Sequence, residues 1–187
     1  MRFIIQRVNQ ACVTIKDKEN SNKIGKGLLI YVGINQNDNE DSLDFIVDKL
    51  LNIKLFDGEN EARWKESVLS LDLEILLISN FTLYCNFKGN KPTFNHAMDG
   101  TNAGILFGKL VSKFKEKYKE DKVKVGEFGE YMFIDSINDG PVTIDWEYPT
   151  EKDEEQKKNN NKNNKNNKKS KNDKNDTKND KNQNKNK

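Results

Sequence analysis

The chain is poor in the residues from which metal sites, disulfides and ordinary hydrolytic triads are built. Among its 187 residues there are one histidine and two cysteines, His96, Cys12 and Cys85, and they lie far apart in the sequence. Two cysteines are too few for a disulfide scaffold, and the three residues together do not match the spacing of a zinc site. A Ser-His-Asp triad would have to use His96, and no Gly-x-Ser-x-Gly elbow presents a serine. We therefore expect no metal and no cofactor.

Long hydrophobic runs and the glycine signatures of nucleotide binding are also missing. No apolar run approaches the roughly 20 residues that a membrane-spanning helix needs. Gln6 and Arg7 interrupt the N-terminal segment before the hydrophobic core of a signal peptide could form. Residues 104–110 have the wrong spacing for a phosphate loop, and residues 25–27 lack the third glycine of a dinucleotide fingerprint. These absences predict a soluble, cytoplasmic protein with no membrane partner.

The composition changes sharply near residue 150. Residues 151–187 contain 13 lysines, 13 asparagines and 7 acidic residues, and no aromatic or aliphatic side chain. Such a segment cannot bury enough apolar surface to offset the entropy lost on ordering, so we expect it to be disordered. It carries a net charge of +6, and because the whole chain carries +2, residues 1–150 carry −4. We predict a single domain in residues 1–150 and a low-complexity tail in residues 151–187.

Alternating or continuous apolar runs predict the strands. Residues 3–8 and 11–15 have one apolar face each and suggest a hairpin. Residues 27–34 and 73–78 are almost continuously apolar, which is typical of strands covered on both faces. The remaining predicted strands are residues 53–56, 123–125, 131–137 and 142–148.

Two amphipathic helices are predicted between these strands. The first follows from the apolar spacing of Leu43 to Leu51, and the second from the stripe between Phe107 and Tyr118. Thr101 or Asn102 is the predicted cap of the second helix. The order of strands and helices fits an α/β or α+β layered domain with its helices on one side.

Two short clusters supply hydroxyl, amide and backbone groups at the ends of predicted strands. They are residues 79–82, which read Ser-Asn-Phe-Thr, and residues 140–143, which read Gly-Pro-Val-Thr. The second cluster belongs to a predicted tight turn, residues 138–141, in which the Gly140–Pro141 bond can be cis at modest cost. An ordinary β-turn is the alternative for this segment. Ser79 and Thr82 can likewise serve only to satisfy backbone groups at a strand end.

Taken together and in order, these segments resemble the D-aminoacyl-tRNA deacylase family, also called the D-tyrosyl-tRNA deacylase family. Its members carry a Ser-Gln-Phe-Thr-Leu-Tyr segment after a buried strand and an Asn-x-Gly-Pro-x-Thr segment near the end of the domain. Here residues 79–84 read Ser-Asn-Phe-Thr-Leu-Tyr and residues 138–143 read Asn-Asp-Gly-Pro-Val-Thr. The resemblance covers residues 1–148. It departs from the family at Asn80, which replaces the usual glutamine, and at Cys85, where a small residue is common.

The resemblance implies the fold, the assembly and the activity. The fold would have two β-sheet layers with helices packed on one side, and the protein would be a homodimer. The activity would be chiral proofreading in translation, by hydrolysis of the ester between a D-amino acid and the 3′-terminal adenosine of tRNA. The Gly140–Pro141 bond would be cis, and this motif would enter the other subunit's pocket. Its main-chain oxygens would then leave no room for an L side chain.

The resemblance also assigns site residues. Ser79, Asn80 and Thr82 would be the catalytic residues, with Thr82 positioning substrate because no base lies near it in the sequence. The substrate's own 2′-hydroxyl and backbone amides would assist the reaction. Phe128 would stack on the adenosine, whereas Met132 fits core packing equally well. The substrate-binding residues would be Phe81, Phe128, Gly129, Met132, Asn138, Gly140, Pro141 and Thr143.

Two other functions remain open at this point. A nucleic-acid-binding module with little or no hydrolysis would use the basic tail to attract phosphates, although the tail can equally be neutral padding. The acidic domain would suit tRNA only if Lys88, Lys91 and the lysines from Lys109 to Lys124 gather on one face. A general small-molecule esterase, in contrast, would cleave simple esters and ignore chirality.

Overall fold

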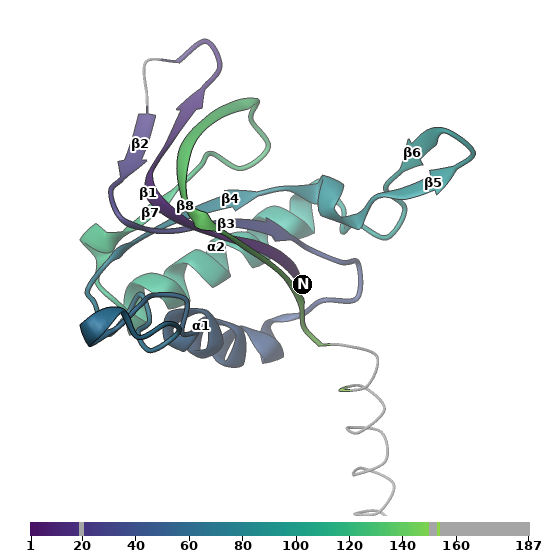
Figure 1. Cartoon of the computed structure of the whole chain (residues 1–187). Coiled ribbons are helices and arrows are strands. Elements are labelled where there is room, and N and C mark those ends of the chain that lie inside the picture. Colours follow the sequence, from purple (N-terminus) through teal and green to yellow (C-terminus); the bar gives the residue numbers. More distant parts are fainter. Residues whose placement is uncertain (19–20, 150–152, 154–187) are drawn as a thin grey trace, which may run out of the picture. The chain divides into compact units, whose positions relative to one another are not determined.

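Strand β1 (Arg2–Ile15) is the element around which the main sheet is built. In the computed structural model (Figure 1), which describes residues 1–18, 21–149 and 153, β1 has antiparallel partners along both of its edges. Its first half pairs with β3 (Gly27–Gly33), its second half with β2 (Ser21–Ile24), and both halves pair with β8 (Met132–Glu147). The sheet continues from β3 through β4 (Glu74–Ser79) to β7 (Val123–Val125) by parallel pairing.

Residues 1–148 form one compact unit. The tail predicted for residues 151–187 lies outside the described residues, apart from Asp153. Within the described part of the chain, neither α1 nor α2 combines the length and hydrophobicity that a bilayer-spanning helix requires.

The sequence predicted an interruption in the first strand pair and another near residues 138–141, and both predictions are wrong. Residues 3–8 and 11–15 form one strand instead of a hairpin, and residues 131–137 and 142–148 belong to a single strand, β8. β8 follows β1 along its whole length, so both halves of β1 find backbone partners without a turn. Between the pairs Gln6–Thr143 and Val8–Asn138, five steps along β8 match two along β1. The predicted turn is therefore a bulge inside a long strand.

Both helices lie on one face of the sheet, which confirms the predicted α+β class with helices on one side (Figure 1). Helix α1 (Leu43–Asn52) follows a 3-10 turn, Glu40–Ser42, and helix α2 (Gly100–Lys117) follows a loop. The predicted caps of α2 are wrong, because the helix begins earlier: Asp99 Oδ1 accepts a bond of 3.0 Å from Asn102 N.

The other face of the sheet is covered by the sheet itself. The second half of β1 curls back with β2 until β2 approaches β7, and Asn22 Nδ2 donates to Val125 O at 2.8 Å. A second apolar cluster, which includes Val13, Ile24, Leu29 and Leu76, fills the space between the two layers. The two predicted β layers are thus the two halves of one curled six-stranded sheet.

A buried loop segment, a small hairpin and three 3-10 turns complete the described fold. Residues 53–56 are not a strand as predicted; Leu55 and Phe56 are apolar because they are buried in the core beyond α1. Strands β5 (Asn86–Lys88) and β6 (Lys91–Thr93) form a separate hairpin that projects from the body of the domain (Figure 1). The other 3-10 turns are Glu59–Glu61, Phe81–Tyr84 and Glu120–Lys122.

Candidate functional site

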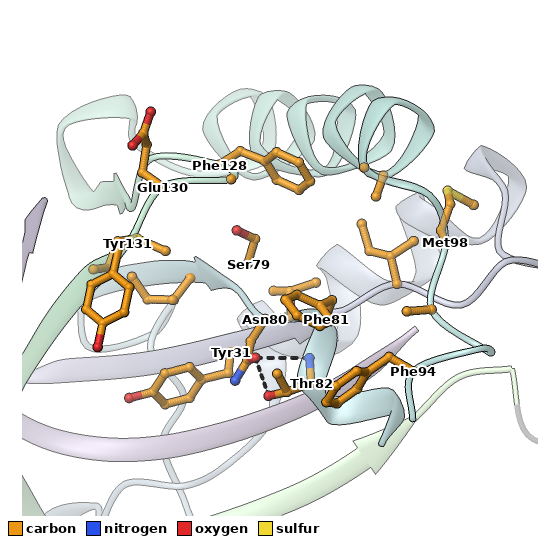
Figure 2. A pocket seen from close by; sticks show the side chains of 18 of the residues that line it. Tyr31, Ser79, Asn80, Phe81, Thr82, Phe94, Met98, Phe128, Glu130 and Tyr131 are labelled. Carbon is orange, nitrogen blue, oxygen red and sulfur yellow. Dashed lines mark hydrogen bonds between the residues drawn. The ribbon is translucent and has the colours of Figure 1, made fainter. Parts of the chain in front are cut away.

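A cavity of about 700 Å³ opens at the carboxyl ends of the parallel strands β3 and β4. The start of α2 and the loop between β7 and β8 complete its walls (Figure 2). This edge of a parallel sheet is where ligands bind in many α/β proteins. The lining residues that the sequence had singled out are Ser79, Asn80, Phe81, Thr82, Phe128, Gly129 and Met132.

The wall formed by residues 79–82 is held against β3 by backbone contacts. Asn80 N donates to Val32 O at 2.8 Å, at the point where β4 ends. A Cβ on Gly33 would lie 2.9 Å from the Leu83 Cβ, so only glycine lets the turn Phe81–Tyr84 pack this closely. The segment is therefore rigidly attached to the central strands.

Asn80 caps this turn with its side chain. Its Oδ1 accepts from Thr82 N at 3.2 Å and from the Thr82 hydroxyl at 2.6 Å (Figure 2). Among the described residues its Nδ2 has no acceptor, so the amide keeps two N–H groups for a ligand. The backbone group at this strand end is thus capped by Asn80, whereas the Thr82 hydroxyl donates to a side-chain oxygen, and the cap leaves the Asn80 nitrogen unexplained.

In the described part of the chain, no base is hydrogen-bonded to the hydroxyls of the site, and Glu130, the one carboxylate that lines the cavity, lies 3.5 Å from the Lys18 ammonium. The Thr82 hydroxyl donates to an amide oxygen, which cannot take its proton, and His96 is exposed and does not line the cavity. The Ser79 hydroxyl points into the cavity between Phe128 and Phe81 (Figure 2). A nucleophile activated by a neighbouring base is therefore not the chemistry that this arrangement favours.

Aromatic rings form two sides of the cavity. Phe81 is 59% exposed, and its ring meets Phe94 edge-on with 5.1 Å between the ring centroids. On the other side Phe128 lies against α2, where a Cβ on Gly104 would be only 3.2 Å from the ring. Two partly exposed phenylalanines facing a common space are suited to a flat aromatic ligand.

The loop that carries Phe128 depends on two further glycines, one for a close contact and one for its backbone conformation. A Cβ on Gly126 would lie 2.6 Å from the Met132 sulfur, and Gly129 has a φ of +81° with open space around it. Met132 lines the cavity and also packs against the second apolar cluster, a position compatible with adenosine binding and with core packing.

The segment 138–143 lies away from this cavity in its own chain. Asn138, Gly140, Pro141 and Thr143 are exposed on β8, and none of them lines the cavity. The Gly140–Pro141 bond is cis. Asn138 pairs with Val8, which pairs with Gly27 at the start of β3, whereas Ser79 is opposite Val32 near its end. Five residues of strand separate the two places, or roughly 17 Å at about 3.3 Å per residue.

Arg7 holds this segment in place. Its Nη1 donates to Leu55 O at 2.8 Å and its Nε donates to Asp139 O at 3.2 Å. Nε is also 3.2 Å from the Asp139 carboxylate. The nearly buried guanidinium therefore ties the bulge of β8 to the loop after α1.

Several lining residues were not predicted as site residues, among them Tyr31, Phe94, Glu130 and Tyr131. Tyr31 is the only residue of β3 that is not fully buried, and burial raises the pKa of its hydroxyl, which stays neutral at physiological pH. A polar aromatic residue inside an otherwise apolar strand was the available signal. Tyr131 and Glu130 carried no such signal, since only the folded loop brings them to the rim.

No cluster of metal-ligating side chains occurs in residues 1–18, 21–149 and 153.

Comparison with known proteins gives consistent matches. Residues 4–147 match the family model described as D-Tyr-tRNA(Tyr) deacylase. A D-aminoacyl-tRNA deacylase of Drosophila melanogaster is 43% identical over 157 residues, which cover 84% of this chain and 98% of that protein. The human D-aminoacyl-tRNA deacylase 1 is 38% identical over 149 residues, which cover 80% of this chain and 71% of that protein.

Solved structures agree with these matches. The structure titled c-Myc DNA Unwinding Element Binding Protein has a TM-score of 0.75 and 37% identity, covering 80% of this chain and all of that one. A probable eukaryotic D-amino acid tRNA deacylase has a TM-score of 0.66 at 16% identity, covering 78% of this chain and 97% of that one, which supports the fold alone.

Proposed function

Because the chain belongs to the D-Tyr-tRNA(Tyr) deacylase family and is a hydrolase of that class, we propose that it cleaves the ester between a D-amino acid and the 3′-terminal adenosine of tRNA. The products are the free D-amino acid and the tRNA, and the proposed compartment is the cytoplasm. The observation that carries the proposal is the rigid segment 79–82 on the wall of an aromatic cavity. Among the described residues, no general base is hydrogen-bonded to a hydroxyl of this segment.

The cavity suits the end of an aminoacylated tRNA. Phe128 and Phe81 offer aromatic surface for the adenine, and the volume of about 700 Å³ is in the range of small-ligand sites. Ser79 lies between the two rings, and the Asn80 amide lies beside Thr82 and Tyr31 (Figure 2); in the proposed pose the ester lies against Ser79 and this amide. The site therefore orients the substrate with few polar groups.

Water attacks the ester carbonyl carbon in this proposal, and the bond to the ribose oxygen breaks. The amide N–H groups of Asn80 stabilise the negative charge that develops on the carbonyl oxygen, and Thr82 keeps the Asn80 side chain in position. The ribose 2′-hydroxyl of the substrate takes part in proton transfer. Such assistance explains how hydrolysis can proceed although, among the described residues, no base accepts a proton from the Ser79 or Thr82 hydroxyl.

We assign the rejection of L-amino acids to residues 138–143 of a second copy of the chain in a homodimer. Within one chain Asn138 lies roughly 17 Å of strand away from Ser79, and residues 138–143 do not line the cavity, so a partner chain would have to present the segment there. Arg7 fixes the bulge, and the main-chain oxygens of Gly140 and its neighbours then crowd the position of an L side chain. Selectivity by exclusion requires a rigid backbone of this kind.

Matched D- and L-tyrosyl-tRNA provide the test of this function. The protein is expected to release tyrosine from the D-ester at least about 100-fold faster than from the L-ester, followed as loss of acid-precipitable label. Equal rates on both esters would favour a general esterase. Binding of both without hydrolysis would favour the nucleic-acid-binding module.

The contact between Gly104 and Phe128 allows a second prediction. Gly104→Ala places a methyl group 3.2 Å from the Phe128 ring, which has to shift into the adenosine site. We expect KM for D-tyrosyl-tRNA to rise roughly tenfold, a cost of about 1.4 kcal/mol. The melting temperature should not fall, because alanine favours the helix by about 1 kcal/mol.

Gly108→Ala is the matched control, because Gly108 lies one turn further along α2 and a Cβ there meets nothing within 4 Å. It should stabilise the protein and leave KM unchanged. An unchanged KM in both variants would contradict the role given to Phe128.

A further inference from the structure

The hairpin β5–β6 contributes nothing to the core, yet it is formed by an ordered register. Asn86 pairs with Thr93, Phe87 with Pro92 and Lys88 with Lys91, and the Thr93 hydroxyl donates to Asn86 O at 3.2 Å. No residue of either strand is buried. The arm projects from the domain directly after the turn Phe81–Tyr84, which forms part of the cavity wall (Figure 1). The stability of the domain therefore does not explain why this hairpin is present.

Two like charges face each other at the tip of this arm. Lys88 and Lys91 are direct cross-strand partners, an arrangement that destabilises a hairpin unless an anion lies between the charges. Neither lysine has an acidic partner among the described residues. The pair is thus an available site for phosphate.

The lysines from Lys109 to Lys124 do not form a comparable surface of unpaired positive charge. Five of the seven lysines between residues 109 and 124 form ion pairs with carboxylates, for example Lys113 with Asp44 at 2.8 Å and Lys119 with Asp72 at 2.9 Å. The acidic domain was expected to suit tRNA only if these lysines gather with Lys88 and Lys91 on one face, and the carboxylates neutralise five of them. Positive charge without a carboxylate partner remains on the hairpin, beside the cavity.

The opposite face of the hairpin is aromatic. Phe87 is 73% exposed, and its cross-strand neighbour is Pro92. Two residues beyond Pro92, Phe94 meets Phe81 in the cavity wall (Figure 2). Apolar side chains therefore extend from the cavity wall onto one face of the hairpin, and Lys88 and Lys91 lie on the other face.

We propose that the β5–β6 hairpin binds the single-stranded nucleotides that precede the terminal adenosine, with Lys88 and Lys91 on their phosphates and Phe87 stacked on a base. Basic side chains combined with exposed aromatic rings are the usual means of holding single-stranded nucleic acid. This inference rests on the proposed function, since it takes the adenosine to be in the cavity.

Binding of two uncleavable ligands tests the role of the lysines. One is tRNA with D-tyrosine linked to its 3′ end by an amide, and the other is the corresponding D-tyrosyl-amide of adenosine alone. In Lys88→Gln/Lys91→Gln the salt slope of log affinity for the tRNA ligand should fall by about 1.4, for two lost phosphate contacts. That corresponds to roughly 25-fold weaker binding at 0.1 M salt if the affinities converge at 1 M. Binding of the adenosine ligand should not change.

Lys23→Gln/Lys49→Gln is the matched control, because both lysines are exposed, neither lines the cavity and neither belongs to the hairpin. The control should bind both ligands like the unmodified protein. The hairpin variant should melt no lower than the control, since a repulsive pair has been removed. Equal salt slopes in the two variants would overturn the inference.

The role of Phe87 is tested separately. Phe87→Ala should weaken binding of the tRNA ligand roughly tenfold and leave the adenosine ligand unaffected, whereas Phe87→Tyr keeps the ring and should restore the affinity. Loss of affinity for both ligands would overturn the inference. If the unmodified protein neither binds the adenosine ligand nor hydrolyses D-tyrosyl-tRNA, the proposed function fails first; if it does both and the hairpin variants behave normally, only the hairpin's role fails.

Discussion

Gly140→Ala is expected to reduce kcat/KM for D-tyrosyl-tRNA by at least about 100-fold while the protein stays folded. Gly140 has a φ of +123°, and a Cβ there would lie 3.1 Å from the backbone N of Val142 and 3.4 Å from Arg7 Nη2. The bulge has to move, and a displacement of about 1 Å at a site of this kind costs on the order of 100-fold. Single-turnover hydrolysis measures the loss, and circular dichroism monitors the fold.

The same variant can show which subunit supplies the motif. A dimer that combines one Gly140→Ala chain with one Asn80→Ala chain contains one site with an intact cavity and an intact motif, if the motif acts across the interface. Purified mixed dimers, isolated with two affinity tags, should then recover about half of the unmodified activity. Were the motif to act on its own chain's cavity, both sites would be defective and the mixed dimer would remain inactive.

Asn80→Asp is expected to lower kcat by about 100-fold or more with little change in stability. Aspartate keeps the oxygen that accepts from Thr82 N and the Thr82 hydroxyl, but it lacks the N–H groups that the proposed mechanism places on the ester carbonyl. Loss of one donor to a developing oxyanion costs on the order of 100- to 1,000-fold. Asn80→Ala should lose a similar factor and also about 1 kcal/mol of stability, because the cap is gone.

Asn80→Gln keeps the amide and lengthens the side chain by one methylene, so it tests whether the exact position of the amide matters. It keeps the donor and matches the family's usual residue, so activity within about tenfold of the unmodified protein is expected, measured under identical single-turnover conditions. If Asn80→Asp were as active as the unmodified enzyme, Asn80 would be a cap and nothing more.

Apolar periodicity was sufficient to predict the central strands and both helices. The continuous apolar runs that became β3 and β4 and the helical stripe in α1 are strong because these elements are buried in one core. The pattern failed where long strands bend. A bulge contains the same glycine, proline and asparagine as a turn, so residues 138–141 could not be distinguished from one.

Local sequence determined which residue types this protein has for its chemistry: amides, hydroxyls, aromatic rings and one proline motif, with a single histidine. Only the tertiary structure decided how they are grouped. It placed residues 79–82 and Phe128 around one cavity and left Gly140 and Pro141 at the opposite end of β3. It also neutralised all four α2 lysines with carboxylates from other elements. These outcomes depend on strand order and on contacts between residues far apart in the chain, which periodicity along one segment cannot encode.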